Sequence, residues 1–119
     1  MNEYQKKPYD LEQRTFLFAK RSFAYFKNLP RTAINIEVSK QGIRSSGSVG
    51  ANFIEANEAL SRKDFAMRVK ICRKEAKESI YWLRLSESSN DQKQEKEILI
   101  AEATELMKIF GAIIEKSKR

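Results

Sequence analysis

Residues that end helices or form turns are scarce in this sequence. Its 119 residues include two Pro and four Gly, while 41% are hydrophobic and 33% are charged. Long segments without Pro, with apolar residues three and four positions apart, are typical of amphipathic helices and not of a many-turned β-fold. A chain of this length forms one domain by default. The sequence therefore predicts a single all-α domain over residues 1–119.

Apolar spacing and turn signals divide this domain into four helices. The predicted helices span residues 11–29, 31–60, 62–86 and 92–116. Asp10 and Ser61 are the expected N-caps of the first and third helices, and Pro30 ends the first. Residues 86–92 are rich in Ser, Asn and Asp and predict a loop, while residues 1–9 are expected to fray. Short connections favour an up-down-up-down antiparallel four-helix bundle.

Apolar residues at helical spacing form stripes on the predicted helices, and the first helix is apolar over more than one stripe. The first helix has a stripe of Phe16, Ala19, Phe23 and Phe26, and a second apolar face of Phe18, Tyr25 and Leu29. The third has Phe65, Val69, Cys72, Ala76, Ile80 and Leu83, and the fourth has Leu99, Ala103, Leu106, Phe110 and Ile113. The second helix is interrupted by Gly42, Gly47 and Gly50, which indicate either a broken helix or a close approach of a neighbouring helix. We favour the close approach, because no Pro intervenes.

Residue types suited to catalysis are missing from the sequence. It contains no His and one Cys, so an intramolecular disulfide, a multi-Cys zinc site and the usual general base are excluded. Cys72 lies on the core stripe and is expected to behave as a small buried hydrophobe. Glu55 and Glu58 could share a helix face but lack further metal ligands. We therefore predict no enzyme activity, no metal and no cofactor.

The N-terminal segment and the length of the apolar runs bear on location. No run approaches the roughly 18 apolar residues of a membrane span. The first ten residues contain no apolar core of a signal peptide. The expected location is cytoplasmic, without a membrane partner.

The acidic and basic residues of the third helix lie at different angles around its axis. At about 100° per residue, seven cations share one flank, while Asp64, Glu75 and Glu78 lie on the other side. This basic flank consists of Arg62, Lys63, Lys70, Arg73, Lys74, Lys77 and Arg84. The seven cations have no acidic partner four residues away on that flank, so they repel one another, and phosphate groups would relieve the repulsion. Tyr81 adds an aromatic surface beside them. The alternative interpretation is an ordinary solvated face.

The opposite flank of the same helix is apolar outside the core stripe. It carries Met67, Ile71 and Trp82, and an apolar strip containing Trp is typical of a protein interface. These three residues are the predicted oligomer interface. The alternative is that they pack on the adjacent helix of a broad core.

Three segments resemble the four-helix-bundle proteins of the 23S rRNA intervening-sequence family. They are IRSSGSVGANFIEA at residues 43–56, SRKDF at 61–65 and KEAKESIYWLRL at 74–85. The first two contain the family patterns A-N-x-x-E and S-x-x-x-F, and the resemblance extends from about residue 10 to the last helix.

The resemblance implies bundles assembled into ring-shaped homopentamers, with no established catalytic activity. It also implies a relation to the accessory protein of diversity-generating retroelements, a basic pentamer that partners a reverse transcriptase and nucleic acid. Asn52 and Glu55 occupy the family motif, and we expect them to be structural polar groups, satisfied inside or between bundles. The basic C-terminal tail, residues 116–119, lies outside the motif.

Two functions follow from these features. The first is a non-catalytic homo-oligomer, five subunits being expected, that binds RNA or DNA backbones through the basic flank. The alternative is a structural or adaptor protein that assembles with an acidic protein partner without nucleic acid. Ion pairs from the flank to Glu95, Glu97, Glu102 or Glu105 would favour the alternative.

Overall fold

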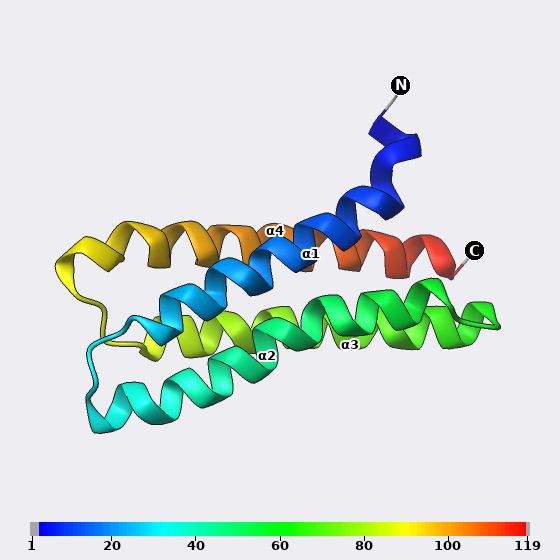
Figure 1. Ribbon diagram of the computed structural model, residues 1–119. Helices are drawn as coiled ribbons and strands as arrows, with labels where there is room; N and C mark the ends of the chain where they lie inside the picture. Colours follow the sequence, from blue (N-terminus) through cyan, green and yellow to red (C-terminus); the bar gives the residue numbers. More distant parts are fainter. Residues whose placement is uncertain (1–2, 119) are drawn as a thin grey trace.

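Four long helices make up the part of the chain that the structure describes. The structure is a computed structural model that describes residues 3–118, with side chains from residue 11 onward. The helices are α1 (Glu3–Lys27), α2 (Ala33–Asn57), α3 (Arg62–Leu85) and α4 (Lys93–Ser117), and a short 3-10 helix, η1 (Asn90–Gln92), precedes α4. Successive helices run in opposite directions (Figure 1). The predicted all-α, antiparallel four-helix fold is confirmed.

Side chains cap the starts of α2 and α3. Thr32 Oγ1 accepts a hydrogen bond from the Asn35 N–H (3.0 Å), and Ser61 Oγ accepts one from the Asp64 N–H (3.0 Å). The predicted Ser61 cap is thus confirmed. Helix α1 begins at Glu3, so Asp10 lies inside it and is not its N-cap. The expected fraying of residues 1–9 includes residues outside the described chain and stays a prediction.

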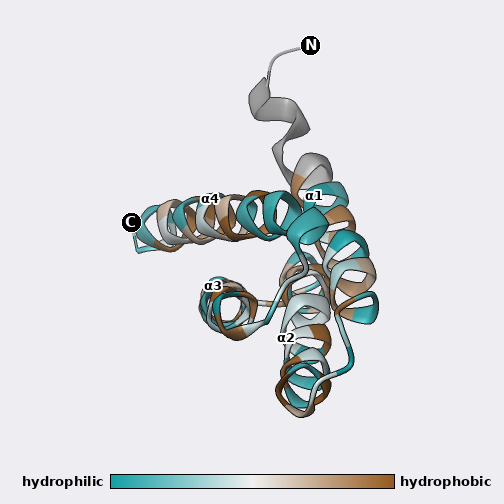
Figure 2. Cartoon of the chain, turned by 90° about the vertical axis from the view of Figure 1, so that its left-hand side faces the viewer, coloured by the Kyte–Doolittle hydropathy of each residue, from teal (hydrophilic) through white to brown (hydrophobic). Residues whose placement is uncertain are grey.

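The core lies between the helices and largely follows the predicted stripes. Helix α3 packs on both α2 and α4, and Figure 2 shows it nearly end-on between them. Four of the six predicted α3 positions are fully buried, while Phe65 and Ile80 are half-buried against the core. In α4 the last buried position is Ile114 and not Ile113.

Helix α1 buries mainly the second of its two apolar faces. Phe16 and Phe23 of the first stripe are 59% and 40% exposed, while Phe26 of that stripe is buried. The buried face also includes two polar residues. The buried α1 positions are Leu11, Thr15, Phe18, Ser22, Tyr25, Phe26 and Leu29. Both faces are apolar, so hydrophobicity alone does not select between them, and a contact with a neighbouring helix is needed to fix the rotation of α1.

That contact is the close approach of α1 to α2. A Cβ added at Gly42 would collide with the ring of Phe26, and one added at Gly50 would lie 2.9 Å from Thr15 Oγ1. Helix α2 remains unbroken through these positions, as predicted. The missing side chains of α2 therefore make room for specific α1 residues and hold that helix in one rotation.

Asn35 ties together the two connections at the same end of the bundle. Its Nδ2 donates to the carbonyls of Pro30 (2.9 Å) and Glu87 (3.0 Å), and its Oδ1 accepts from the Glu87 N–H (2.8 Å). Tyr25 joins the same end through hydrogen bonds with Ser86 and Ser88. These bonds satisfy loop polar groups that the bundle would otherwise bury unpaired.

The glycine contacts predict opposite effects of one substitution at two positions. Gly42→Ala must displace the buried Phe26 ring and should destabilise the fold by about 1–3 kcal/mol. Gly111→Ala meets only the end of Arg73, at 3.9 Å, and should stabilise α4 by about 0.5–1 kcal/mol. Urea unfolding of both variants measures the difference. Equal effects would show that the α1–α2 approach does not constrain packing.

Cys72 supplies a second prediction. It is fully buried, and desolvation raises the pKa of its thiol from 9.0 to about 12. Because thiolate is disfavoured in the native state, this group's contribution to stability is present below the unfolded pKa and lost as pH rises from 9 toward 12. Native protein at pH 8 should resist iodoacetamide while urea-unfolded protein is alkylated, as mass spectrometry can show. Rapid native alkylation would contradict this burial.

Candidate nucleic-acid interface

All seven residues of the basic flank are exposed on α3. The helix buries Val69, Cys72 and Ala76 against its neighbours, so the side chains about 100° away emerge beside the core edge. The structure thus confirms the predicted phase of α3, and it places Arg62 and Lys70 of the flank near the end of α4.

Two arginines of α1 form ion pairs with two acidic residues of α4. Arg14 donates through Nε and Nη2 to Glu102 (3.1 and 2.8 Å), and Arg21 does the same to Glu95 (3.0 and 2.6 Å). Such two-pronged pairs are stronger than single contacts. The hydrogen bonds to Glu95 also raise the pKa of Arg21. These carboxylates are therefore committed to α1 and not to α3.

Two of the three acidic residues on the other side of α3, Glu75 and Glu78, pair with an arginine of α2. Arg44 Nη2 contacts Glu75 (3.0 Å) and Glu78 (2.7 Å), and hydrogen bonds to both raise the pKa of the guanidinium. Glu75 is buried, so this pair satisfies a carboxylate that would otherwise be costly. Trp82 Nε1 donates to Glu78 (2.9 Å), and this bond, with help from Arg44, lowers the pKa of Glu78.

Six of the seven residues of the basic flank form no ion pair with the described residues, and among them Lys74 acts on Glu78 only through its charge. Lys63, Lys70, Arg73, Lys74, Lys77 and Arg84 form no ion pair with any residue in the described part of the chain. Glu105 pairs with Lys108, 3.9 Å away, and not with α3. The ion pairs that would have favoured a purely structural role for the flank are not formed by these six residues.

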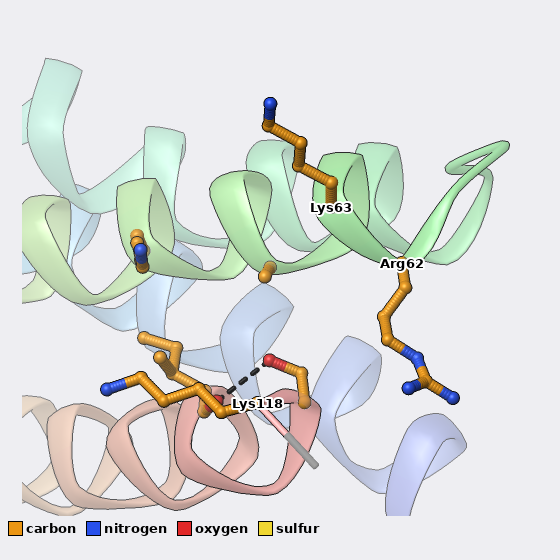
Figure 3. A pocket seen from close by; sticks show the side chains of 7 residues that line it. Arg62, Lys63 and Lys118 are labelled. Atoms are coloured by element: carbon orange, nitrogen blue, oxygen red, sulfur yellow. Dashed lines mark hydrogen bonds between the residues drawn. The ribbon is translucent and has the colours of Figure 1, made fainter.

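Part of the flank borders a shallow hollow between the start of α3 and the end of α4. The hollow has a volume of about 360 Å³; α3 contributes Arg62, Lys63, Ala66 and Lys70, and α4 contributes Ile114, Ser117 and Lys118. In Figure 3 Lys63 points away from α4, whereas Arg62 extends on the α4 side and Lys118 lies along α4. The hollow is thus lined by cationic side chains and by the apolar residues Ala66 and Ile114.

Sequence reasoning missed the contribution of α4 to this surface. Lys118 belongs to the basic tail outside the family motif, yet it lies at the hollow and pairs with Glu115 (3.0 Å). The predicted antiparallel order of the helices contained the signal, because it brings the end of the fourth helix beside the start of the third.

The predicted oligomer interface is partly exposed. Met67 is half exposed, and Ile71 and Trp82 are half-buried, with Trp82 packing against the core and bonded to Glu78. Trp82 therefore has a role within the bundle, in line with the alternative interpretation. Met67 has the most free surface of the three.

The family-motif residues differ in their surroundings. Asn52 is half-buried and satisfied, because its Nδ2 donates to the Ser48 carbonyl (2.8 Å) and its Oδ1 accepts from Arg68 (3.4 Å). Glu55 is exposed, and its expected role between bundles stays a prediction. Among the side chains that the structure describes, residues 11–118, no group of three His, Cys, Asp or Glu could hold a metal ion. No described helix is long and apolar enough to cross a membrane.

Comparison with known proteins agrees with this fold. The sequence profile of the family described as 23S rRNA-intervening sequence protein matches residues 7–112. A crystal structure of a protein of unknown function from the S23 ribosomal protein family of Bacteroides thetaiotaomicron is similar, with a TM-score of 0.75 and 33% identity. The match covers 92% of this chain and 98% of that one. A search of curated proteins gave no match. The relation to the accessory protein of diversity-generating retroelements stays a prediction. The chain belongs to the 23S rRNA-intervening sequence protein family.

Proposed function

We propose that this chain is a non-catalytic, oligomeric protein that binds RNA or DNA backbones through the basic flank of α3. The observation that carries the proposal is the set of six exposed cations without ion pairs to the described residues. Four acidic residues of α3 and α4 are held by arginines of other helices: Glu75, Glu78, Glu95 and Glu102. A polyanion is the partner that such a surface fits.

The phosphate groups of a nucleic-acid backbone fit this surface, because they carry negative charge at high density along the strand. A protein can bind them whatever the base sequence is. Each Lys or Arg that meets a phosphate releases condensed counterions, so affinity falls linearly with salt on a logarithmic scale. Contacts to the backbone position a protein on nucleic acid but do not specify sequence. The flank lacks any arrangement aimed at base edges, and binding should therefore be insensitive to sequence.

Reversing three charges of the flank tests this proposal. The Lys70→Glu, Lys74→Glu, Lys77→Glu variant should bind RNA and DNA more weakly and lower the salt slope by about 2–3, since each lost phosphate contact removes about 0.7–0.9. Fluorescence anisotropy across a salt series measures both quantities. Circular dichroism and light scattering should match the parent, because all three residues are exposed.

A matched control separates position from total charge. Lys20→Glu, Lys27→Glu, Lys40→Glu changes three exposed lysines of α1 and α2, and each set of three reversals lowers the net charge of +7 by six. The control should retain a salt slope close to that of the parent. If both variants lose binding equally, only net charge matters and the flank is not the site. If the parent binds no nucleic acid at low salt but retains an acidic protein, the adaptor function holds instead.

We also propose that the chain forms a homo-oligomer through Met67, Ile71 and Trp82, with five subunits expected. A half-exposed Met beside two half-buried apolar residues supports this surface, and several copies of the flank would raise affinity for one polyanion through avidity.

Charge placed on the most exposed residue of this strip tests the assembly. Met67→Glu should shift the mass measured by light scattering from several times 13.8 kDa toward that of one chain, because a buried unpaired charge opposes association. Its stability to urea should change by no more than about 0.5 kcal/mol, as is usual for surface substitutions. A parent that is monomeric at micromolar concentration would contradict the proposal.

A further inference from the structure

Tyr81 is an exposed aromatic side chain on the same side of α3 as the basic flank. It is 57% exposed. Lys77 precedes it by four residues and Arg84 follows it by three, so both are its neighbours on the helix surface. At about 1.5 Å per residue, these cations lie about 6 and 4.5 Å from it along the helix axis, one on each side.

A contact with Trp82 restrains the Tyr81 ring. Trp82 contacts it edge-to-face, with ring centroids 5.0 Å apart and an angle of 74°. Trp82 is itself fixed by its hydrogen bond to Glu78, which Arg44 holds in turn (2.7 Å). A ring restrained in this way loses less conformational entropy when a ligand binds to it.

We infer that Tyr81 is a base-stacking platform and that the flank therefore selects single-stranded over double-stranded nucleic acid. This inference rests on the proposed function. In a nucleotide strand, phosphates lie on both sides of each base, as the cations lie on both sides of this ring. The faces of bases are free in a single strand, whereas a duplex presents its backbone and base edges. The cations alone bind both single-stranded and double-stranded nucleic acid, and the Tyr81 ring adds affinity for the single-stranded form.

Phe16 is exposed to a similar degree as Tyr81 but differs in its setting. It is 59% exposed, the Lys20 ammonium lies 5.9 Å from its ring centroid, and it is on α1, away from the flank. Phe16 thus has a comparable free surface without the two flanking cations of α3. It provides a matched control.

The test compares three probes with the full chain at one salt concentration. They are a fluorescein-labelled oligoadenylate of about 12 nucleotides, within the usual site sizes, the corresponding RNA duplex, and a strand of equal length in which abasic spacers replace the bases. Parent protein should bind oligoadenylate more tightly than the abasic strand by about 5- to 150-fold, the range for one base–aromatic stack. Tyr81→Ala should remove this difference and leave binding of the abasic strand and the duplex unchanged.

Two further variants and a second readout keep the result specific. Tyr81→Phe retains the ring and should preserve the preference for oligoadenylate, and Phe16→Ala should also leave it unchanged. Trp82 is the only tryptophan of the chain and contacts Tyr81, so its fluorescence should change when oligoadenylate binds but not when the abasic strand binds.

The outcomes separate this inference from the proposed function. Equal affinity of the parent for oligoadenylate and the abasic strand, or a Tyr81→Ala variant that keeps the preference, overturns the stacking role while backbone binding stands. Failure of the parent to bind any of the three probes at low salt overturns both.

Discussion

The close approach of α1 to α2 determines much of the remaining structure. Gly42 and Gly50 leave room for the Phe26 ring and the Thr15 side chain, and these contacts set the rotation of α1. That rotation buries one face of the helix and turns Arg14 and Arg21 toward α4. A packing constraint between apolar and small residues thereby decides where charged groups lie.

The distribution of ion pairs follows from this geometry and bears on function. Arg14 and Arg21 pair with two carboxylates of α4, and Arg44 pairs with two of α3. The pairs themselves are partly exposed and contribute modestly to stability. Their larger effect is to separate charge, because these four carboxylates are held by other helices while six cations of α3 form no ion pair with the described residues.

Much of this could be predicted from the sequence, because helix periodicity is a local signal. The stripe of α3 gives its phase, and from it the exposure of all seven flank residues. The buried side of α1 was not predictable in this way. Its two apolar faces compete, and the buried one contains Thr15 and Ser22, so the choice depends on the glycines of another helix. The place of Lys118 beside the flank is likewise a tertiary property.

The rotation of α1 about its own axis buries the side chain of Ser22. Its hydroxyl is fully buried, and Oγ has no hydrogen-bond partner among the described residues. Unpaired buried hydroxyls are unfavourable, and the same face also buries five apolar residues, Leu11, Phe18, Tyr25, Phe26 and Leu29. The packing of α1 on the glycines of α2 therefore includes an unsatisfied hydroxyl within an otherwise apolar contact. Replacing that hydroxyl by a group of similar size without a polar atom would remove an unfavourable burial and leave the approach of the two helices unchanged.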